Sequence, residues 1–251
     1  MTAMASAALS LTGSGHLLVY QLGACRALLK SSIKIQHVAG SSGGAIVAAL
    51  VSHNLNLEEF AQDFIQTRER GLSLLKEKLQ SETTIQGPSL SICTTQCRDG
   101  QLQVFDFVST SDDRLLQALE ASCRIPPSFH PWDIISSTRS YADSEGIRMD
   151  NNDYYVDGGI AAPAPPTPPN LRRILISPIA GQSKNNDWRI SPASSSYSWP
   201  SIDLKHNFGV DASFANLRAL RAAMGMTTSS ELKVWYQRGQ DDAQRFLEDT
   251  F

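Results

Sequence analysis

Two successive units of strand, glycine-rich turn and helix occupy the first 53 residues, and they restrict the fold more than any other feature of the sequence. An apolar strand over residues 7–11 leads through a glycine-rich turn into a helix over residues 17–30, whose apolar side chains recur at helical spacing. A second strand over residues 35–39 leads in the same way into an apolar helix over residues 45–53. Two such units in succession predict a parallel sheet with helices packed on its faces.

The remaining segments fit one α/β domain. With 251 residues, 41% hydrophobic and 19% charged, the chain has the size and composition of a single globular domain. We expect one domain over residues 1–251, with a core over about 8–180 and a C-terminal helical extension over about 205–251. The expected helices are 57–70, ended by Gly71, then 72–79, 112–122 and 213–224; the expected strands are 89–96, 101–109, 154–156 and 173–176, with a surface loop over 182–201.

Charge and hydropathy exclude several classes of protein. The formal net charge is −3, from 22 Lys and Arg against 25 Asp and Glu, which gives no overall attraction to nucleic acid. The longest aliphatic run, residues 45–51, is far shorter than the ~18 residues that a membrane-spanning helix needs. Residues 1–14 contain no Lys or Arg, unlike a secretory signal. We therefore expect a cytoplasmic protein without a nucleic-acid partner.

Cysteine and histidine give no sign of a metal centre. The 4 cysteines do not form a disulfide framework, and we expect Cys93 and Cys97 to be buried apolar thiols. The histidines at 16, 37, 53 and 130 show no metal-ligand spacing.

The second turn carries a candidate nucleophile. Gly40-Ser41-Ser42-Gly43-Gly44 matches the pattern Gly-x-Ser-x-Gly, with Ser42 at the nucleophile position. A nucleophile on a sharp strand-to-helix turn needs glycine two residues before and after it, because larger side chains would collide. The turn exposes the hydroxyl, and the start of the next helix offers the Gly43 N–H to a developing oxyanion.

The first turn and a later aspartate could complete such a site. Gly13, Ser14 and Gly15 can direct backbone N–H groups at an anion, although a tight turn without a function is also consistent with them. A dinucleotide-binding loop is excluded, since Leu18 stands where that motif requires glycine. Asp157 ends a predicted strand before two glycines and could be the base that a serine hydroxyl needs, or part of an ordinary Asp-Gly turn.

The order of these three elements resembles the patatin-like phospholipases. The first glycine turn is similar to that of the adiponutrin and adipose triglyceride lipase branch, and Ala121-Ser122-Cys123-Arg124-Ile125-Pro126-Pro127-Ser128-Phe129 resembles a segment that these proteins carry before the aspartate strand. The resemblance spans roughly residues 8 to 160. It implies an α/β patatin-like three-layer sandwich, with a central mostly parallel sheet flanked by helices.

The resemblance also implies a function. It indicates a lipid acyl hydrolase, of the phospholipase A or acylglycerol lipase type, that cleaves acyl esters through a Ser42–Asp157 dyad and an acyl-enzyme. Gly13, Ser14, Gly15 and Gly43 would form the oxyanion hole, and no metal or organic cofactor is implied. The substrate would be a phospholipid or acylglycerol at the surface of a membrane or lipid droplet, and an alcohol in place of water would make the enzyme a transacylase.

The first turn departs from the pattern of many patatins. Thr12, Ser14, Leu17 and Leu18 replace the usual acid, middle glycine, basic residue and last glycine. Because Leu17 replaces a basic residue, the site lacks a cation that could bind an anionic headgroup, and we expect a substrate with a neutral headgroup.

Three questions stay open at the level of sequence. Ser42, Asp157 and His206 run in the order of an α/β-hydrolase triad, although the elbow of that fold usually follows several strands. A silent lipid-binding or scaffold protein could keep the same fold without catalysis. Trp188, Tyr197 and Trp199 could enter a lipid interface or cover the core.

Overall fold

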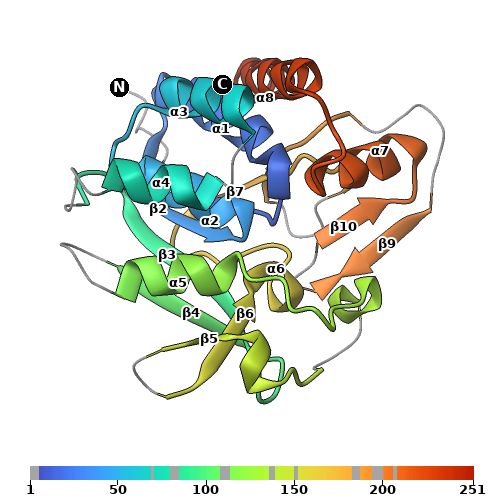
Figure 1. Cartoon of the computed structure of the whole chain (residues 1–251). Coiled ribbons are helices and arrows are strands. Elements are labelled where there is room, and N and C mark those ends of the chain that lie inside the picture. The colour runs from blue at the N-terminus through green and yellow to red at the C-terminus, as the bar shows by residue number, and fades with distance from the viewer. Residues whose placement is uncertain are drawn as a thin grey trace.

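A central sheet of eight strands organises the protein (Figure 1). The computed structural model describes residues 6–68, 71–79, 85–107, 114–135, 139–149, 152–182, 187–193, 200–205 and 208–251. The sheet strands are β1 (Ser6–Leu11), β2 (Lys34–Ser41), β3 (Ser89–Gln96), β4 (Leu102–Phe107), β5 (Ile147–Arg148), β6 (Tyr154–Asp157), β7 (Arg172–Ile176) and β8 (Trp188–Ile190). Strands β9 (Ser201–Leu204) and β10 (Phe208–Asp211) form a separate antiparallel pair.

Helices cover this sheet. The α-helices are α1 (Leu18–Leu29), α2 (Gly43–Ser52), α3 (Leu57–Thr67), α4 (Gly71–Leu79), α5 (Arg114–Ser122), α6 (Gly158–Ala161), α7 (Phe214–Ala223) and α8 (Ser229–Thr250). The described residues also form the short 3-10 helices η1 (Gly15–Leu17), η2 (Pro131–Ile134) and η3 (Asp143–Glu145). Within the described ranges, no helix combines the length and the apolar character needed to cross a bilayer.

Polar side chains define where the helices begin. The Asn56 side chain accepts hydrogen bonds from two N–H groups in the first turn of α3, and Ser213 accepts one from Asn216 in α7. At the start of α8, Thr228 and Glu231 each accept the other's backbone N–H, which is a capping box. These caps satisfy donors that a helix cannot pair internally.

The strands that meet at the middle of the sheet are parallel and deeply buried. β1 lies between β2 and β7, and β2 lies between β1 and β3, all in parallel register. The side chains of Ala7 through Leu11 have no exposed surface, although successive residues point to opposite faces. Both faces of β1 are therefore covered, as expected for a parallel sheet between helical layers. The predicted α/β class with a mostly parallel, helix-flanked sheet is confirmed.

β3 joins the parallel strands to an antiparallel region. β4 pairs with β3 from Leu90 to Thr95 along one edge. The other edge of β3 is shared: β2 pairs with its first part, up to Cys93, and β6 pairs antiparallel with its last part, from Thr94. Strands β2 and β6 therefore meet end to end on the same edge of β3.

Two sequence predictions were wrong in detail. α3 ends at Thr67 because Arg68 adopts a left-handed conformation, with φ 53°, and Gly71 starts α4 instead of ending α3. The expected loop over 182–201 contains strand β8, which pairs parallel with β7. The Trp188 ring in β8 packs edge-on against Phe246 of α8 and against Phe251, the residue after α8, so it covers the core. Tyr197 and Trp199 lie outside the described residues.

Candidate active site

Ser42 alone forms the sharp turn between β2 and α2. The sequence predicted a turn over residues 40–44, but the observed turn is shorter, because β2 continues to Ser41 and α2 begins at Gly43. Ser42 has φ 52° and ψ −127°, a conformation that an L-residue adopts at a cost of ~1–3 kcal/mol. Such strain persists only where the surrounding structure enforces the conformation. Ser42 therefore lies at the carboxyl end of strand β2.

Glycines on both sides of Ser42 are required by close backbone contacts. A Cβ added at Gly40 would lie 2.4 Å from the Gly44 carbonyl oxygen, and one at Gly44 would lie 2.4 Å from the Leu11 carbonyl oxygen. Each distance is a severe clash with backbone atoms. The spacing Gly-x-Ser-x-Gly therefore reflects the packing of the turn against itself and against the end of β1.

The register of β3 brings Asp157 to Ser42. Ser41, the last residue of β2, pairs with Cys93, and Asp157, the last residue of β6, pairs with the adjacent Thr94. Two strands that run toward each other thus end at neighbouring positions, and the structure places the predicted nucleophile and the predicted base together.

The Asp157 carboxyl is buried and incompletely paired. Its side chain is 6% exposed, and Oδ1 accepts the Gly159 N–H at 2.8 Å. Burial raises the pKa of Asp157 to about 6, against the opposing effects of the Ser42 hydroxyl and the Gly159 N–H. Oδ2 is buried and has no partner of full hydrogen-bond geometry in the described part of the chain, although Ser42 lies close enough to affect the carboxylate. A carboxylate with a raised pKa and a free lone pair suits a general base.

This pKa predicts the pH dependence of any reaction in which Asp157 accepts a proton. Only the deprotonated carboxylate is a base, so kcat/KM for a neutral short-chain ester should be constant above a pKa of about 6 and fall about tenfold per pH unit below it. The measurement is a pH–rate profile of p-nitrophenyl butyrate hydrolysis. Because an ordinary histidine titrates in the same range, at about 6.5, His206→Ala is the control. Loss of activity across the whole pH range in a folded His206→Ala protein would assign the base to histidine.

The first glycine turn lies directly against the elbow. A Cβ at Gly13 would lie 3.6 Å from the Ser42 Cβ and 3.7 Å from the Gly159 Cα, so Gly13 separates the two candidate catalytic segments. A Cβ at Gly43 would lie 2.9 Å from the Gly15 backbone nitrogen. Within the described ranges, the N–H groups of Gly13, Ser14, Gly15 and Gly43 donate no hydrogen bond. Four backbone donors without an acceptor in the described part of the chain therefore lie in the two turns that meet at Ser42.

A buried glutamine supports the unusual residues of this turn. Gln21 of α1 accepts a hydrogen bond from the Ser14 hydroxyl at 3.0 Å and donates to the Thr12 carbonyl oxygen at 2.8 Å. Its side chain has no exposed surface. Leu17 is also fully buried in the core, so position 17 does not present its side chain to the site. Thr12 and Ser14 thus have a structural partner that the sequence did not reveal.

A cavity opens beside the turn. It has a volume of about 690 Å³ and is lined by Ser42 and Gly43 together with side chains of α1 to α5 and α7. Its apolar walls include Leu18, Ile46, Phe64, Leu72, Ile147 and Met224. Lys76 and Glu120, which form an ion pair, supply charge on one wall. A cavity of this size with apolar walls beside Ser42 has room for a hydrocarbon chain.

The end of α5 and the residues that follow it hold both candidate catalytic residues. The Ser122 hydroxyl accepts the Ser42 N–H at 2.9 Å and donates to the Cys93 carbonyl oxygen at 2.7 Å. The Arg124 carbonyl oxygen accepts the Asp157 N–H at 2.8 Å. The sequence indicated this segment only through its resemblance to a family, and the structure shows that its backbone and one hydroxyl connect the elbow to the aspartate.

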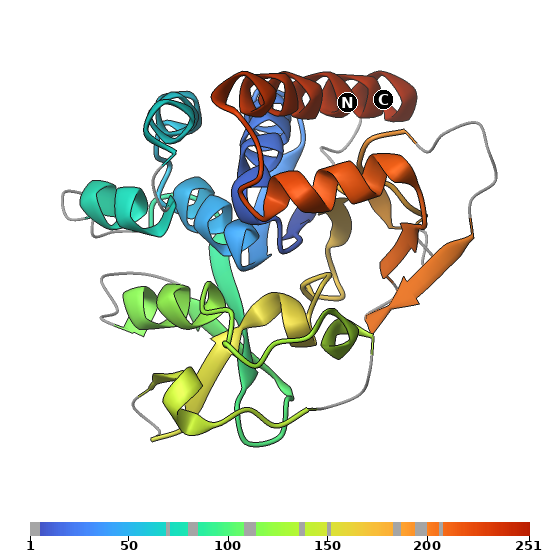
Figure 2. The same ribbon diagram turned by 45° about the vertical axis from the view of Figure 1, so that its right-hand side comes forward.

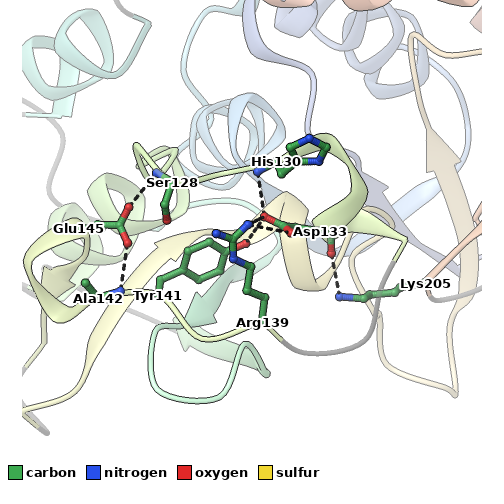
Figure 3. A network of polar contacts seen from close by, with 8 residues as sticks. All are labelled: Ser128, His130, Asp133, Arg139, Tyr141, Ala142, Glu145 and Lys205. Carbon is green, nitrogen blue, oxygen red and sulfur yellow. Dashed lines mark hydrogen bonds and ion pairs between the residues drawn. The ribbon is translucent and has the colours of Figure 1, made fainter.

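Glu145 fixes that segment from outside. Its carboxylate accepts the N–H groups of Ser128 and Ala142, at 2.8 and 3.0 Å (Figure 3). The Glu145 carbonyl oxygen accepts a hydrogen bond from the Arg124 side chain at 3.1 Å. The contacts with Ser128, and to a smaller extent the Ala142 N–H, lower the pKa of Glu145. The loop over 139–145 is thereby tied to the residues that position Asp157.

Asp133 organises the adjoining loop. Its carboxylate accepts the His130 N–H at 2.8 Å, the Tyr141 hydroxyl at 3.1 Å and the Arg139 guanidinium at 3.1 Å, as Figure 3 shows. Burial opposes ionisation, but these bonds outweigh it and hold the pKa of Asp133 below its usual range. Lys205 donates to the Asp133 carbonyl oxygen. All of these partners of the Asp133 carboxylate lie in the same loop, so we interpret the network as structural.

A second group of serine, histidine and aspartate lies elsewhere on the sheet. The His37 ring contacts the hydroxyls of Ser89 and Ser91, at 2.8 and 3.1 Å, and Ser91 donates to Asp106. The carboxylate does not contact the imidazole, so it cannot orient the ring as in a catalytic triad. The cluster lies on β2, β3 and β4, away from the glycine turns. His206, the third residue of the alternative triad, lies outside the described residues.

A family model and a solved structure are similar to this chain. Residues 9–76 match the model of the family described as patatin-like phospholipase. Among solved structures, that of VipD from Legionella pneumophila has a TM-score of 0.47, at 12% sequence identity over 98% of this chain and 67% of that chain. No curated protein matches the chain.

The predicted resemblance to patatin-like phospholipases is thus confirmed where the family model applies. The matched residues contain the first glycine turn and the Ser42 elbow, whereas Asp157 lies beyond them. In general terms, this family supports a lipid acyl hydrolase. The adiponutrin branch stays a prediction.

Proposed function

We propose that the protein cleaves acyl esters of phospholipids or acylglycerols through a Ser42–Asp157 dyad. The observation that carries this proposal is the register of β3, which brings a strained serine and a buried, incompletely paired carboxylate to adjacent positions. Beside them lie a cavity with apolar walls and four backbone N–H groups that have no acceptor among the residues that the structure describes. Nucleophile, base, oxyanion donors and a space for the acyl chain are the parts that acyl transfer needs.

The residues account for each step of the reaction. Asp157 accepts the Ser42 hydroxyl proton as Oγ attacks the ester carbonyl carbon, and the carbonyl oxygen takes up the electron pair as an oxyanion. The N–H groups of Gly13, Ser14, Gly15 and Gly43 donate to this oxyanion, helped by the N-terminus of α2. The intermediate expels the alcohol, which takes the proton from Asp157, and an acyl-enzyme remains.

Water then hydrolyses the acyl-enzyme by the same steps in reverse order. Asp157 accepts a proton from water, whose oxygen attacks the acyl-enzyme, and the fatty acid leaves as Ser42 recovers its proton. An alcohol in the place of water would transfer the acyl group instead. None of these steps needs a metal or an organic cofactor. Peripheral contact with a membrane or lipid droplet follows, since the substrates reside there.

Fatty acid release by the wild-type protein tests this function. We expect turnover of p-nitrophenyl butyrate, and release of fatty acid from phosphatidylcholine vesicles or from a triacylglycerol emulsion, because the cavity accepts an apolar chain. Free fatty acid is measured by mass spectrometry against the Ser42→Ala protein as background. Absence of release from all three substrates, with vesicle binding retained, would instead identify a silent lipid-binding protein.

A further inference from the structure

Helix α7 carries its large apolar side chains on the outside. Leu217, Leu220 and Met224, which we call the α7 face, are 62, 50 and 78% exposed. Their spacing of three and four residues places them on one side of the helix and the residue that follows it. The large apolar side chains of the helix expected over 213–224 therefore point away from the core, which is the reverse of the usual arrangement for a surface helix.

The inner side of α7 is already fully packed. Asn216 accepts the Ala180 N–H at 2.8 Å and donates to the carbonyl oxygens of Ala180 and Asp211, at 2.8 and 2.7 Å. Ala219 and Ala222 complete the buried side of the helix. Small residues and a fully bonded amide thus fix α7 on the protein. The exposure of its large apolar side chains is therefore not caused by poor packing of the helix, and these side chains are available to a partner.

The α7 face continues into the candidate active-site cavity. Ala223 and Met224 line this cavity together with Ser42. A Cβ at Gly15 would lie 2.2 Å from the Ala223 carbonyl oxygen, so the end of α7 touches the first glycine turn. Ile125, which is 62% exposed, lines the same cavity. Figure 2 shows α7 at the front of the molecule, with its C-terminal end beside the start of α1. An apolar surface therefore leads from the helix to the nucleophile.

The charges of α7 indicate what covers this face. Arg218 and Arg221 are exposed, and the helix contains no acidic residue. Arginines beside an exposed apolar stripe are typical of helices that lie in the interface of an anionic membrane, with the stems in the apolar zone and the guanidinium groups among the headgroups. A two-fold contact between copies of this chain would instead bring these positive charges toward one another.

We propose that α7 docks the protein on anionic lipid bilayers and holds the cavity mouth at the membrane surface. This inference rests on the proposed function for the nature of the substrate, but the docking itself is independent of catalysis. Leu217, Leu220 and Met224 enter the acyl region, while Arg218 and Arg221 contact phosphate groups. A substrate lipid then moves from the bilayer along Met224 to Ser42 without passing through water.

Vesicle binding in a Ser42→Ala background separates docking from turnover. The proteins are cosedimented with vesicles of phosphatidylcholine containing about one-third phosphatidylglycerol. We expect Leu217→Ser/Leu220→Ser to weaken binding at least about tenfold, because two apolar side chains lose their place in the bilayer. Val234→Ser on α8, an exposed apolar residue outside the α7 face, is the matched control and should bind normally. Arg218→Glu should weaken binding only when phosphatidylglycerol is present.

The same substitutions are made with Ser42 intact to test the two proposals separately. The soluble ester p-nitrophenyl butyrate should be hydrolysed by Leu217→Ser/Leu220→Ser at the wild-type rate, and vesicle phospholipid at least about tenfold more slowly. Unchanged vesicle binding by this variant would overturn the docking role of α7. The docking role would also be overturned if sedimentation velocity showed that the wild-type protein is a dimer and that the same substitutions dissociate this dimer. Normal docking without turnover of either substrate would refute the proposed function and leave this inference standing.

Discussion

Ser42→Ala is expected to lower kcat/KM for p-nitrophenyl butyrate by at least about 10⁴-fold, because the acyl-enzyme cannot form without the Oγ atom. The backbone N–H groups of the glycine turns remain, so substrate binding should change little. Alanine accepts the same backbone conformation as serine, and the Ser122 bond to the residue 42 N–H is retained, so the fold should be preserved. Initial rates and thermal unfolding of the purified variant are the measurements.

Ser73→Ala is the matched control for this loss. Ser73 lines the same cavity but has no contact with Asp157 in the described part of the chain. We expect it to retain the wild-type rate. An Ser42→Ala protein that is folded and keeps more than about one-tenth of the activity would show that Ser42 is not the nucleophile.

Asp157→Asn should lower kcat by about 10³-fold with little change in KM, since the amide keeps the shape of the side chain but cannot accept the Ser42 proton. The asparagine Oδ1 can still accept the Gly159 N–H, so α6 should begin as before. Steady-state kinetics on the same ester measure this effect. The loss is expected at every pH, because no carboxylate remains to titrate.

Asp242→Asn distinguishes loss of a base from loss of any buried carboxylate. Asp242 is 7% exposed, its pKa is also raised by burial, and it accepts the Tyr20 hydroxyl between α8 and α1. Its substitution should affect the free energy of unfolding and leave kcat unchanged. Equal losses of activity in the two variants would contradict the role assigned to Asp157.

Local patterns were sufficient to predict the elements that carry the site. The apolar runs before residues 13 and 42 become β1 and β2, and the glycine spacing around Ser42 is explained by backbone contacts within a few residues. Such contacts are local, so a sequence motif can record them. The strand expected at 154–156 also forms, with Asp157 as its last residue.

The proximity of Ser42 and Asp157 could not be derived from local pattern. It depends on the register of β2 and β6 along one edge of β3, which no residue of either strand encodes alone. The Ser122 hydroxyl and the Gln21 amide are likewise ordinary polar side chains until the fold gives them partners. In the sequence, only the resemblance to a family joined these segments.

Helix α7 shows why an amphipathic pattern does not fix orientation. The stripe of Leu217, Leu220 and Met224 is visible in the sequence, but so are the small residues between them. Asn216 decides the outcome, because its three hydrogen bonds to Ala180 and Asp211 require the small side to face inward. A single polar residue such as Asn216 does not contribute to a hydrophobic pattern, so the pattern could not show which side of the helix faces inward.

Covalent trapping tests the central claim most directly. The wild-type protein is incubated with a fluorophosphonate, which reacts with activated serines, and the adduct is located by mass spectrometry of peptides. We predict one adduct per chain, on Ser42, with labelling slowed in Asp157→Asn and unaffected in His206→Ala. Ser42→Ala should not be labelled. An adduct on another serine, or equal labelling of Ser42 in the wild-type and Asp157→Asn proteins, would contradict the Ser42–Asp157 dyad.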